Sequence, residues 1–367
     1  MMKNFKIAIA VLLAIILSLG PTSSVFAAEQ LQTINMPYQF PITPDDPEWK
    51  EFDKKEDMLA VCQIPEDILK QMTTEALLDT VLNYPFITDY FAFNNYEDAA
   101  KTFMNDFNGF RELYSRSDLT ETLLAKYQST NIVSSTTTVH NAAALYSSDF
   151  FTVSNLEFLI GYDQILHEDY TATEAKQFDE MLSNKMKLRN QIGSLTSNSE
   201  TYLNFMVQQN SIQPASTNTT VKTPKGTSVP VTIVSPDLSS VEKALLNSIF
   251  DNKYPKATRK SPATTNYNCH SYAWYSQSTG NRYWMNNPTA YMTDGSYKRS
   301  TDIRPRQGFK VYYYNADHSG VVNNIKVISG VQTFLYWSKW GSAGLYEHTV
   351  SYCPYSGGTR HYYKSAT

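Results

Sequence analysis

The chain has 367 residues, 42% of them hydrophobic and 18% charged, with a formal net charge of -4 at pH 7. This length is sufficient for two domains. The excess of acidic over basic residues disfavours a nucleic-acid partner, because binding to a phosphate backbone requires a basic surface.

Residues 1–28 have the features of an export signal. Lys3 and Lys6 precede an apolar stretch, and Val25-Phe26-Ala27 suits cleavage by signal peptidase. The apolar stretch is shorter than the roughly 20 residues that span a bilayer, and no second segment approaches that length. We therefore expect a secreted protein, extracellular or associated with the cell wall, without stable membrane insertion.

Residues 29–192 are expected to form an all-α domain. After a proline-rich leader, apolar residues recur at helical spacing, and the region predicts about five to seven helices. Capping boxes formed by Asp118 with Glu121 and by Ser154 with Glu157 predict helix starts. No set of catalytic side chains is apparent in this region.

Ser, Thr and Asn dominate residues 193–238, which are predicted to be a linker with one short strand at 229–234. A capping box at Ser239 and Glu242 then predicts a helix. From residue 239 to 367, short apolar runs rich in Tyr, Trp, Asn and Gly indicate a compact α+β domain. The predicted fold class of the whole chain is therefore α+β.

The chain contains three cysteines, Cys62, Cys269 and Cys353. An odd number in an exported protein leaves at least one free thiol or an intermolecular bridge. Cys62 follows an apolar run and is interpreted as a small buried hydrophobic residue. A disulfide between Cys269 and Cys353 is the structural alternative to a reactive Cys269.

Cys269 and His318 are the candidate catalytic residues. Cys269 follows a polar loop and precedes a helical face, so it is expected in a first helical turn, where backbone N–H groups favour a thiolate and can hold an oxyanion. His318 opens a predicted strand that follows one at 308–314 and precedes one at 334–338. We expect His318 to face the cysteine helix, with the thiolate as nucleophile.

This layout resembles the NlpC-type and CHAP (cysteine- and histidine-dependent amidohydrolase/peptidase) domains, which are small papain-like domains of secreted bacterial wall hydrolases. The matching positions lie in the C-terminal third: Cys269, His318 in His-Ser-Gly-Val-Val, and the Ser-Lys-Trp-Gly turn that begins at Ser338. The resemblance implies an antiparallel sheet, attack of Cys269 on an amide carbonyl and proton transfer by His318. It also implies a peptide or peptidoglycan substrate, and we expect no metal and no cofactor.

These families place a polar residue on the strand after the histidine to orient its ring. No Asp or Glu lies between residues 319 and 346. The candidates are Ser338, Lys339 and His348. Ser338 is preferred, because a lysine would oppose an imidazolium and His348 lies further along the chain.

Three alternatives remain. The chain could be a non-catalytic secreted interaction protein with a degenerate papain-like module, in which Cys269 is bonded to Cys353. A transglutaminase-like acyl transferase shares the order of Cys and His but normally uses an aspartate after the histidine. A metal site formed by His270, His318 and His348 lacks the spacing of zinc motifs. His270 itself is expected at the surface, because its side chain points away from its neighbour on a helix.

Overall fold

The computed structural model describes residues 33–130, 149–166, scattered positions between 171 and 185, and 217–367 except 236, 239, 303, 329, 356–358 and 367. Residues 33–367 form one compact unit. The predicted export signal and the predicted linker before residue 217 lie outside the described residues. Among the described residues, no helix is both long and apolar enough to cross a membrane.

The first half of the chain is helical, as predicted. Its elements are η1 (Pro47–Glu51), α1 (Lys55–Val61), α2 (Glu66–Gln71), α3 (Thr74–Leu82), η2 (Ile87–Ala92), α4 (Tyr96–Asp106), α5 (Asn108–Leu113), α6 (Leu119–Ser129) and α8 (Asp149–Leu166). In the described part of this half, the strand-like pairing is confined to an isolated bridge between Ile34 and Met72.

Of the helix starts predicted at Asp118 and Ser154, the first is confirmed, although its capping bond is absent, and the second is wrong. Asp118 precedes α6 but makes no capping bond, because its carboxylate accepts a hydrogen bond from the Thr74 hydroxyl at 2.7 Å. Ser154 and Glu157 lie inside α8 rather than at its beginning. The Glu157 carboxylate accepts from the Tyr127 hydroxyl at 2.8 Å. The carboxylates of Asp118 and Glu157, which the local pattern assigns to helix caps, therefore accept hydrogen bonds from side chains distant in the sequence.

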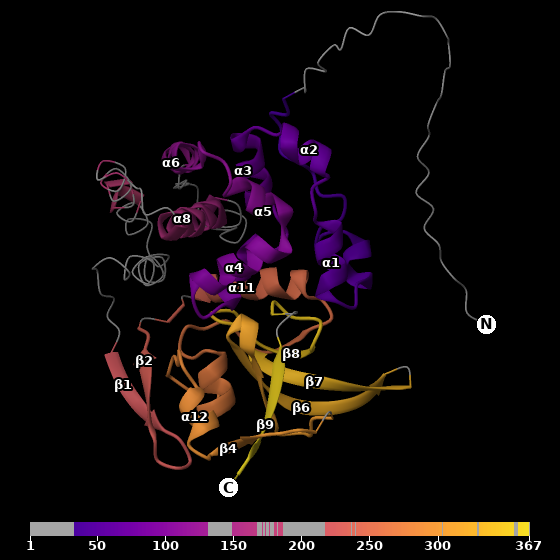
Figure 1. Cartoon of the computed structure of the whole chain (residues 1–367), viewed down its shortest axis with the longest axis vertical. Helices are drawn as coiled ribbons and strands as arrows, with labels where there is room; N and C mark the ends of the chain where they lie inside the picture. The colour runs from indigo at the N-terminus through magenta and orange to yellow at the C-terminus, as the bar shows by residue number, and fades with distance from the viewer. Residues whose placement is uncertain are drawn as a thin grey trace, which may run out of the picture. The chain divides into compact units, whose positions relative to one another are not determined.

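The second half contains two antiparallel sheets, so the predicted α+β class is confirmed. A seven-stranded sheet has the order β3-β8-β7-β6-β5-β9-β4, and β1 and β2 form a separate pair (Figure 1). The strands are β1 (Thr217–Lys222), β2 (Ser228–Ile233), β3 (Thr258–Ser261), β4 (Tyr297–Arg299), β5 (Lys310–Tyr313), β6 (His318–Ile328), β7 (Val331–Lys339), β8 (Leu345–Thr349) and β9 (Arg360–Ser365). The helical elements are α11 (Ser240–Lys253), η3 (Ser271–Tyr275), α12 (Thr289–Thr293) and η4 (Tyr314–Ala316).

The pair β1–β2 belongs to the segment that composition assigns to a linker. Val229 and Val231 alternate with exposed residues and are buried in a cluster that includes Trp274 and Met285. The backbone of Thr232 also exchanges two hydrogen bonds of 2.8 Å with Trp284. Because β2 buries apolar side chains against the second half, the described part of the predicted linker is a structured hairpin.

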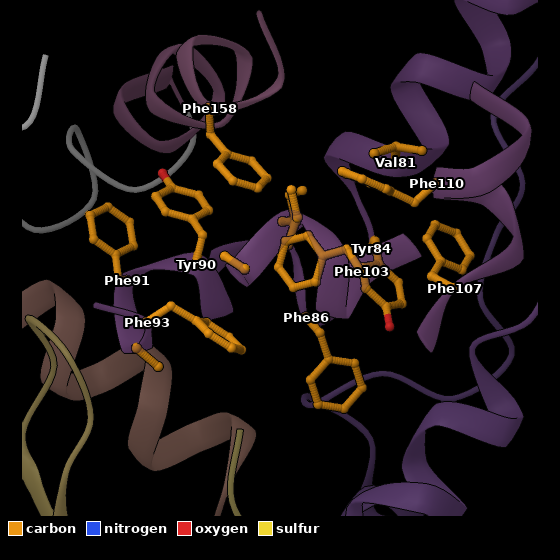
Figure 2. Packing of buried hydrophobic residues seen from close by; sticks show 14 of the residues in the cluster. Val81, Tyr84, Phe86, Tyr90, Phe91, Phe93, Phe103, Phe107, Phe110 and Phe158 are labelled. Atoms are coloured by element: carbon orange, nitrogen blue, oxygen red, sulfur yellow. The ribbon is translucent and has the colours of Figure 1, made fainter. Parts of the chain in front are cut away.

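One hydrophobic core joins the helical half to the sheet. Around residues 86–93 it is largely aromatic; Figure 2 shows Tyr90 beside Phe158 of α8, with ring centroids 4.6 Å apart. The same cluster includes Tyr254 and Trp340 of the second half, whose centroids are 5.1 Å apart. Between the halves, Phe86 contacts Tyr254 and Phe93 contacts Tyr355, with ring centroids 6.2 and 5.0 Å apart, so aromatic side chains pack the two halves against each other.

A buried ionic cluster fixes η2 between the two halves. Asp89, which is fully buried, accepts from Lys253 at 2.8 Å and from the Tyr254 hydroxyl, and Lys55 lies 3.9 Å away. Lys55 also donates to the carbonyl of Pro354 at 2.8 Å. Buried charges require such partners, since an unpaired charge in the interior is very costly. The cluster therefore fixes the position of η2 and of the loop after it, residues 93–95.

Candidate active site

Cys269 and His270 are the first helical residues after a polar loop, as predicted, and they lead directly into the single π-type turn of η3, so the helix ends at Tyr275. The backbone N–H of Ser276 bonds to the carbonyl of Ser271 at 3.0 Å, and the chain is extended at Ser276. So short a helix has only a weak macrodipole, so side chains near Cys269 are needed to add to the stabilisation of its charge. η3 contacts β6 and β7.

Asn268 supports the backbone on both sides of Cys269. Its Oδ1 accepts from the backbone N–H groups of Ser271 and Met285, each at 3.1 Å, and its Nδ2 donates to the carbonyl of Met285 at 2.7 Å. Both Asn268 and Cys269 are fully buried. These contacts determine which end of the Asn268 amide is oxygen and which is nitrogen.

Asn94, in the loop between η2 and α4, reaches the thiol from the helical half. Its Nδ2 lies 3.3 Å from Sγ of Cys269 and 2.9 Å from the carbonyl oxygen of Asp317. Its Oδ1 accepts from Asn268 at 3.2 Å and lies 3.5 Å from Sγ. Asn94 is 175 positions from Cys269, and no local sequence signal marks it. It links the thiol to the residue that precedes His318.

His318 is the first residue of β6 and is fully buried. Its ring stacks on Tyr355, with centroids 3.5 Å apart and planes 9° apart. Neither ring nitrogen has a hydrogen-bond partner among the described residues, so the ring makes no hydrogen bond to Sγ of Cys269. Burial, together with the nearby His348 and His270, lowers the pKa of His318 well below its usual value. Its imidazole is therefore neutral at pH 7.

The predicted surface position of His270 is wrong, because the residue is fully buried. Its Nδ1 lies 2.8 Å from the Ser319 hydroxyl and its Nε2 lies 3.1 Å from the Asp317 carboxylate. Asp317 adopts a left-handed conformation with a φ of 40° and also accepts from Tyr312 at 2.8 Å. Asp317 and Ser319, at the start of β6, thus bind an imidazole that the helical pattern predicts to be exposed to solvent.

The pKa of His270 is raised, whereas the pKa of His318 is lowered. Burial opposes protonation of His270, but the negative charge of a Cys269 thiolate and the hydrogen-bonded Asp317 carboxylate outweigh it and raise the pKa to about 10. Burial likewise opposes ionisation of Asp317, but the bond from His270 holds its pKa below the usual value. While Cys269 is a thiolate, the pair at pH 7 is an imidazolium and a carboxylate, and the ring nitrogens of His270 contact Ser319 and Asp317.

Ser338, the predicted third catalytic residue, pairs with His348 rather than His318. The two atoms, Oγ and Nε2, are 2.6 Å apart, and the indole of Trp340 donates to the same hydroxyl at 3.0 Å. Nδ1 of His348 faces the carbonyl of Thr349 at 2.8 Å, so Nδ1 carries the proton and Nε2 accepts from Ser338. No side chain among the described residues orients the ring of His318 through a hydrogen bond.

Lys339, the second candidate for that role, supports a loop. Its buried ammonium donates to the carbonyl of Thr264 at 2.9 Å and to the carbonyls of Gly341 and Ala343. Burial lowers its pKa to about 7, despite the opposing charges of Asp237 and Cys269. The lysine therefore fixes the turn after β7 and does not bond His318.

All three cysteines are free, so the alternative in which Cys269 is bonded to Cys353 lacks its disulfide. Cys62 is buried, as predicted. Burial raises the pKa of both Cys62 and Cys353 to about 12, which makes them poor nucleophiles. Within the described residues, no group of three or more His, Cys, Asp or Glu side chains is placed to hold a metal ion.

Comparison with known proteins finds no matching family model, no matching curated protein and no matching solved structure.

The buried histidines predict a loss of stability in acid. His348 takes up a proton near pH 6.5 in the unfolded chain, but burial lowers its folded pKa to about 4. Between these values the unfolded state binds more protons than the folded state. The free energy of unfolding therefore decreases as the pH is lowered, by up to about 3 kcal/mol for His348. His318 acts in the same direction. His270 acts oppositely, and its contribution is lost as the pH rises from about 6.5 towards 10.

Thermal unfolding of the wild type and His348→Gln, followed by circular dichroism from pH 7.5 to 4.5, checks this prediction. We expect the variant to lose less stability over this range than the wild type. Parallel curves would contradict the prediction, whatever the offset between them.

Proposed function

We propose that this protein is a secreted thiol hydrolase that cleaves an amide or peptide bond, with Cys269 as nucleophile and His318 as general base. The Asn94 contact carries the proposal: one amide nitrogen touches both Sγ and the carbonyl of Asp317, so the thiol lies near the start of the strand that bears His318. A buried imidazole with no hydrogen-bond partner calls for an explanation, and a base awaiting its proton supplies one.

His270 has a different role in the proposed reaction. Its two ring nitrogens contact the Ser319 hydroxyl and the Asp317 carboxylate, and the Cys269 thiolate and Asp317 raise its pKa, so it serves as the cationic partner of the thiolate. An imidazolium beside a cysteine stabilises the thiolate. His270 and Asp317 therefore provide positive charge and rigidity near Cys269, while His318 supplies the neutral base.

In the proposed reaction, His318 takes the thiol proton and an electron pair of Sγ forms a bond to the amide carbon, so the carbonyl π pair moves to oxygen. When this pair returns, the C–N bond breaks and the nitrogen receives the proton from His318. Water then gives a proton to His318 as its oxygen attacks the thioester carbon; the C–S bond breaks, the sulfur takes that proton from His318, and the carboxylic acid leaves. Because Cys269 and His318 are fully buried, substrate entry must open the site and bring them to about 3 Å.

The substrate class rests on the sequence. The export signal and the resemblance to NlpC-type and CHAP domains favour the stem peptides of peptidoglycan. The same two features support a papain-like arrangement of the second half and a location outside the cell or in the wall. In a transglutaminase-like reaction the acidic residue would orient the catalytic histidine, whereas Asp317 bonds to His270.

Activity assays of cysteine variants and iodoacetamide labelling of the thiols test the proposed nucleophile. We expect Cys269→Ser to lose at least about 10³-fold of the activity on peptidoglycan or peptide amides, and Cys353→Ser to retain it, because only the first thiol is a nucleophile. In the native wild type, iodoacetamide should label Cys269 first. Cys62 and Cys353, with pKa values of about 12, have a thiolate fraction of only about one in 10⁴ at pH 8.

Mass spectrometry of the products separates the alternatives. A mass gain of one water identifies hydrolysis, whereas incorporation of an added amine identifies acyl transfer. Full activity of Cys269→Ser would refute the nucleophile. A folded wild type without activity on any of these substrates would favour the non-catalytic interaction protein.

A further inference from the structure

We infer that Asn94 is a catalytic residue of the Cys269 centre, donating a hydrogen bond first to the thiolate and then to the oxyanion that replaces it. This inference rests on the proposed function. It assigns to the helical half a side chain that the reaction needs, although that half contains no recognisable catalytic motif.

The orientation of the Asn94 amide follows from its neighbours. The carbonyl of Asp317 is only an acceptor, so the atom 2.9 Å from it must be the Nδ2 donor. Asn268 has its own oxygen occupied by two backbone N–H groups, and it therefore presents its Nδ2 to Oδ1 of Asn94. With one N–H directed at Asp317, the second N–H of Asn94 remains for Sγ at 3.3 Å.

The same amide suits both protonation states of the thiol. A thiol can donate to Oδ1 at 3.5 Å, whereas a thiolate can accept only from Nδ2. Once Sγ has attacked, negative charge moves from sulfur to the carbonyl oxygen bound next to it. The N–H that held the thiolate is then free, within reach of that oxygen and already oriented, as electrostatic stabilisation of a transition state requires.

The residues just before Asn94 are bonded to the second half through their backbone carbonyls. The carbonyl of Phe91 accepts from the N–H of Ser342 at 2.8 Å, and the carbonyl of Ala92 accepts from the Tyr355 hydroxyl. A Cβ at Gly341 would lie 2.4 Å from the oxygen of Phe91, so only glycine permits this approach. The loop that carries Asn94 is thus fixed to the second half before any substrate binds.

A competing interpretation is that Asn94 merely covers the thiol, since Cys269 is fully buried. The two roles differ in what an isosteric change does. Asn94→Asp keeps the shape of the cover but replaces the Nδ2 donor with a carboxylate oxygen, which repels a thiolate. Asn94→Ala removes both the cover and the donor.

The experiment compares Asn94→Ala and Asn94→Asp with Asn95→Ala, a matched control in the same loop. Asn95 caps α4, its Oδ1 accepting from Asp98 at 2.8 Å, and it is not bonded to Cys269. Two quantities are measured in the full chain: kcat/KM on the substrate found for the wild type, and the rate of iodoacetamide labelling of Cys269 against pH.

We expect kcat/KM to fall about 10²–10³-fold in Asn94→Ala, as for loss of one oxyanion donor, and further in Asn94→Asp. The labelling curve of both variants should move to higher pH, because the thiolate has lost its donor. Asn95→Ala should keep the wild-type curve and activity even if it melts earlier.

Faster labelling of Asn94→Ala on an unshifted pH curve, or undiminished kcat/KM, would overturn the inference in favour of a cover. The labelling readout needs no substrate. An inactive wild type would therefore refute the proposed hydrolase, whereas an unshifted labelling curve would refute the role of Asn94, and the two failures are distinguishable.

Discussion

Replacement of His318 with glutamine is expected to lower kcat/KM by about 10²–10⁴-fold, the usual contribution of a general base. Glutamine approximates the volume of the buried ring but cannot take up the thiol proton. Because burial lowers the pKa of His318 well below its usual value, the wild-type ring is in the base form at pH 7. The measurement is steady-state kinetics between pH 5 and 9, with circular dichroism to confirm folding.

Two further variants serve as controls for His318→Gln. Ser338→Ala should change kcat/KM less than tenfold, because its hydroxyl is bonded to His348 and Trp340 rather than to His318. His270→Gln should weaken labelling of Cys269 by removing a positive charge, without removing the base. If His270→Gln abolished turnover while His318→Gln retained it, the assigned roles of the two histidines would be reversed.

Asp89→Asn is expected to lower the free energy of unfolding by about 3–5 kcal/mol, because it leaves buried cations without their counter-ion. The carboxylate of Asp89 is fully buried with Lys253 at 2.8 Å and Lys55 at 3.9 Å. Asparagine has nearly the same shape, so lost charge rather than a cavity produces the effect. Chemical denaturation at pH 7, followed by fluorescence, measures it.

The cost should decrease as the pH rises. Burial already lowers the pKa of Lys253, and Asp89 partly offsets this. Without the carboxylate, Lys253 sheds its proton more readily, and a neutral amine is cheaper to bury than an ammonium. A loss of stability that is constant between pH 7 and 9 would show that the charge of Lys253 is not what Asp89 compensates.

Glu97→Gln is the matched control for Asp89→Asn. Glu97 pairs with Lys101 at 2.6 Å, but both side chains are more than half exposed. Solvent screens such a pair, so the change should be within about 0.5 kcal/mol. An equally large loss in both variants would mean that burial does not determine the cost.

Much of the architecture follows from local pattern. Helical periodicity and alternating strands predict the α+β class, and the structure starts β6 at His318 and includes the predicted strand at 334–338 in β7. Elsewhere tertiary contacts prevail over local pattern. Local pattern predicts the strand at 229–234, but its pairing with β1 and the burial of Val229 and Val231 against the second half depend on tertiary contacts.

The candidate site divides in the same way. By itself, the sequence singled out Cys269 and His318, because a cysteine before a helical turn and a histidine opening a strand are local signals. Only the tertiary structure decided that Asn94 reaches the thiol, that His270 is buried against Asp317, and that Ser338 pairs with His348. The reason is physical: these contacts join residues up to 175 positions apart, and their geometry exists only once the shared core and the Asp89 cluster have brought the two halves together.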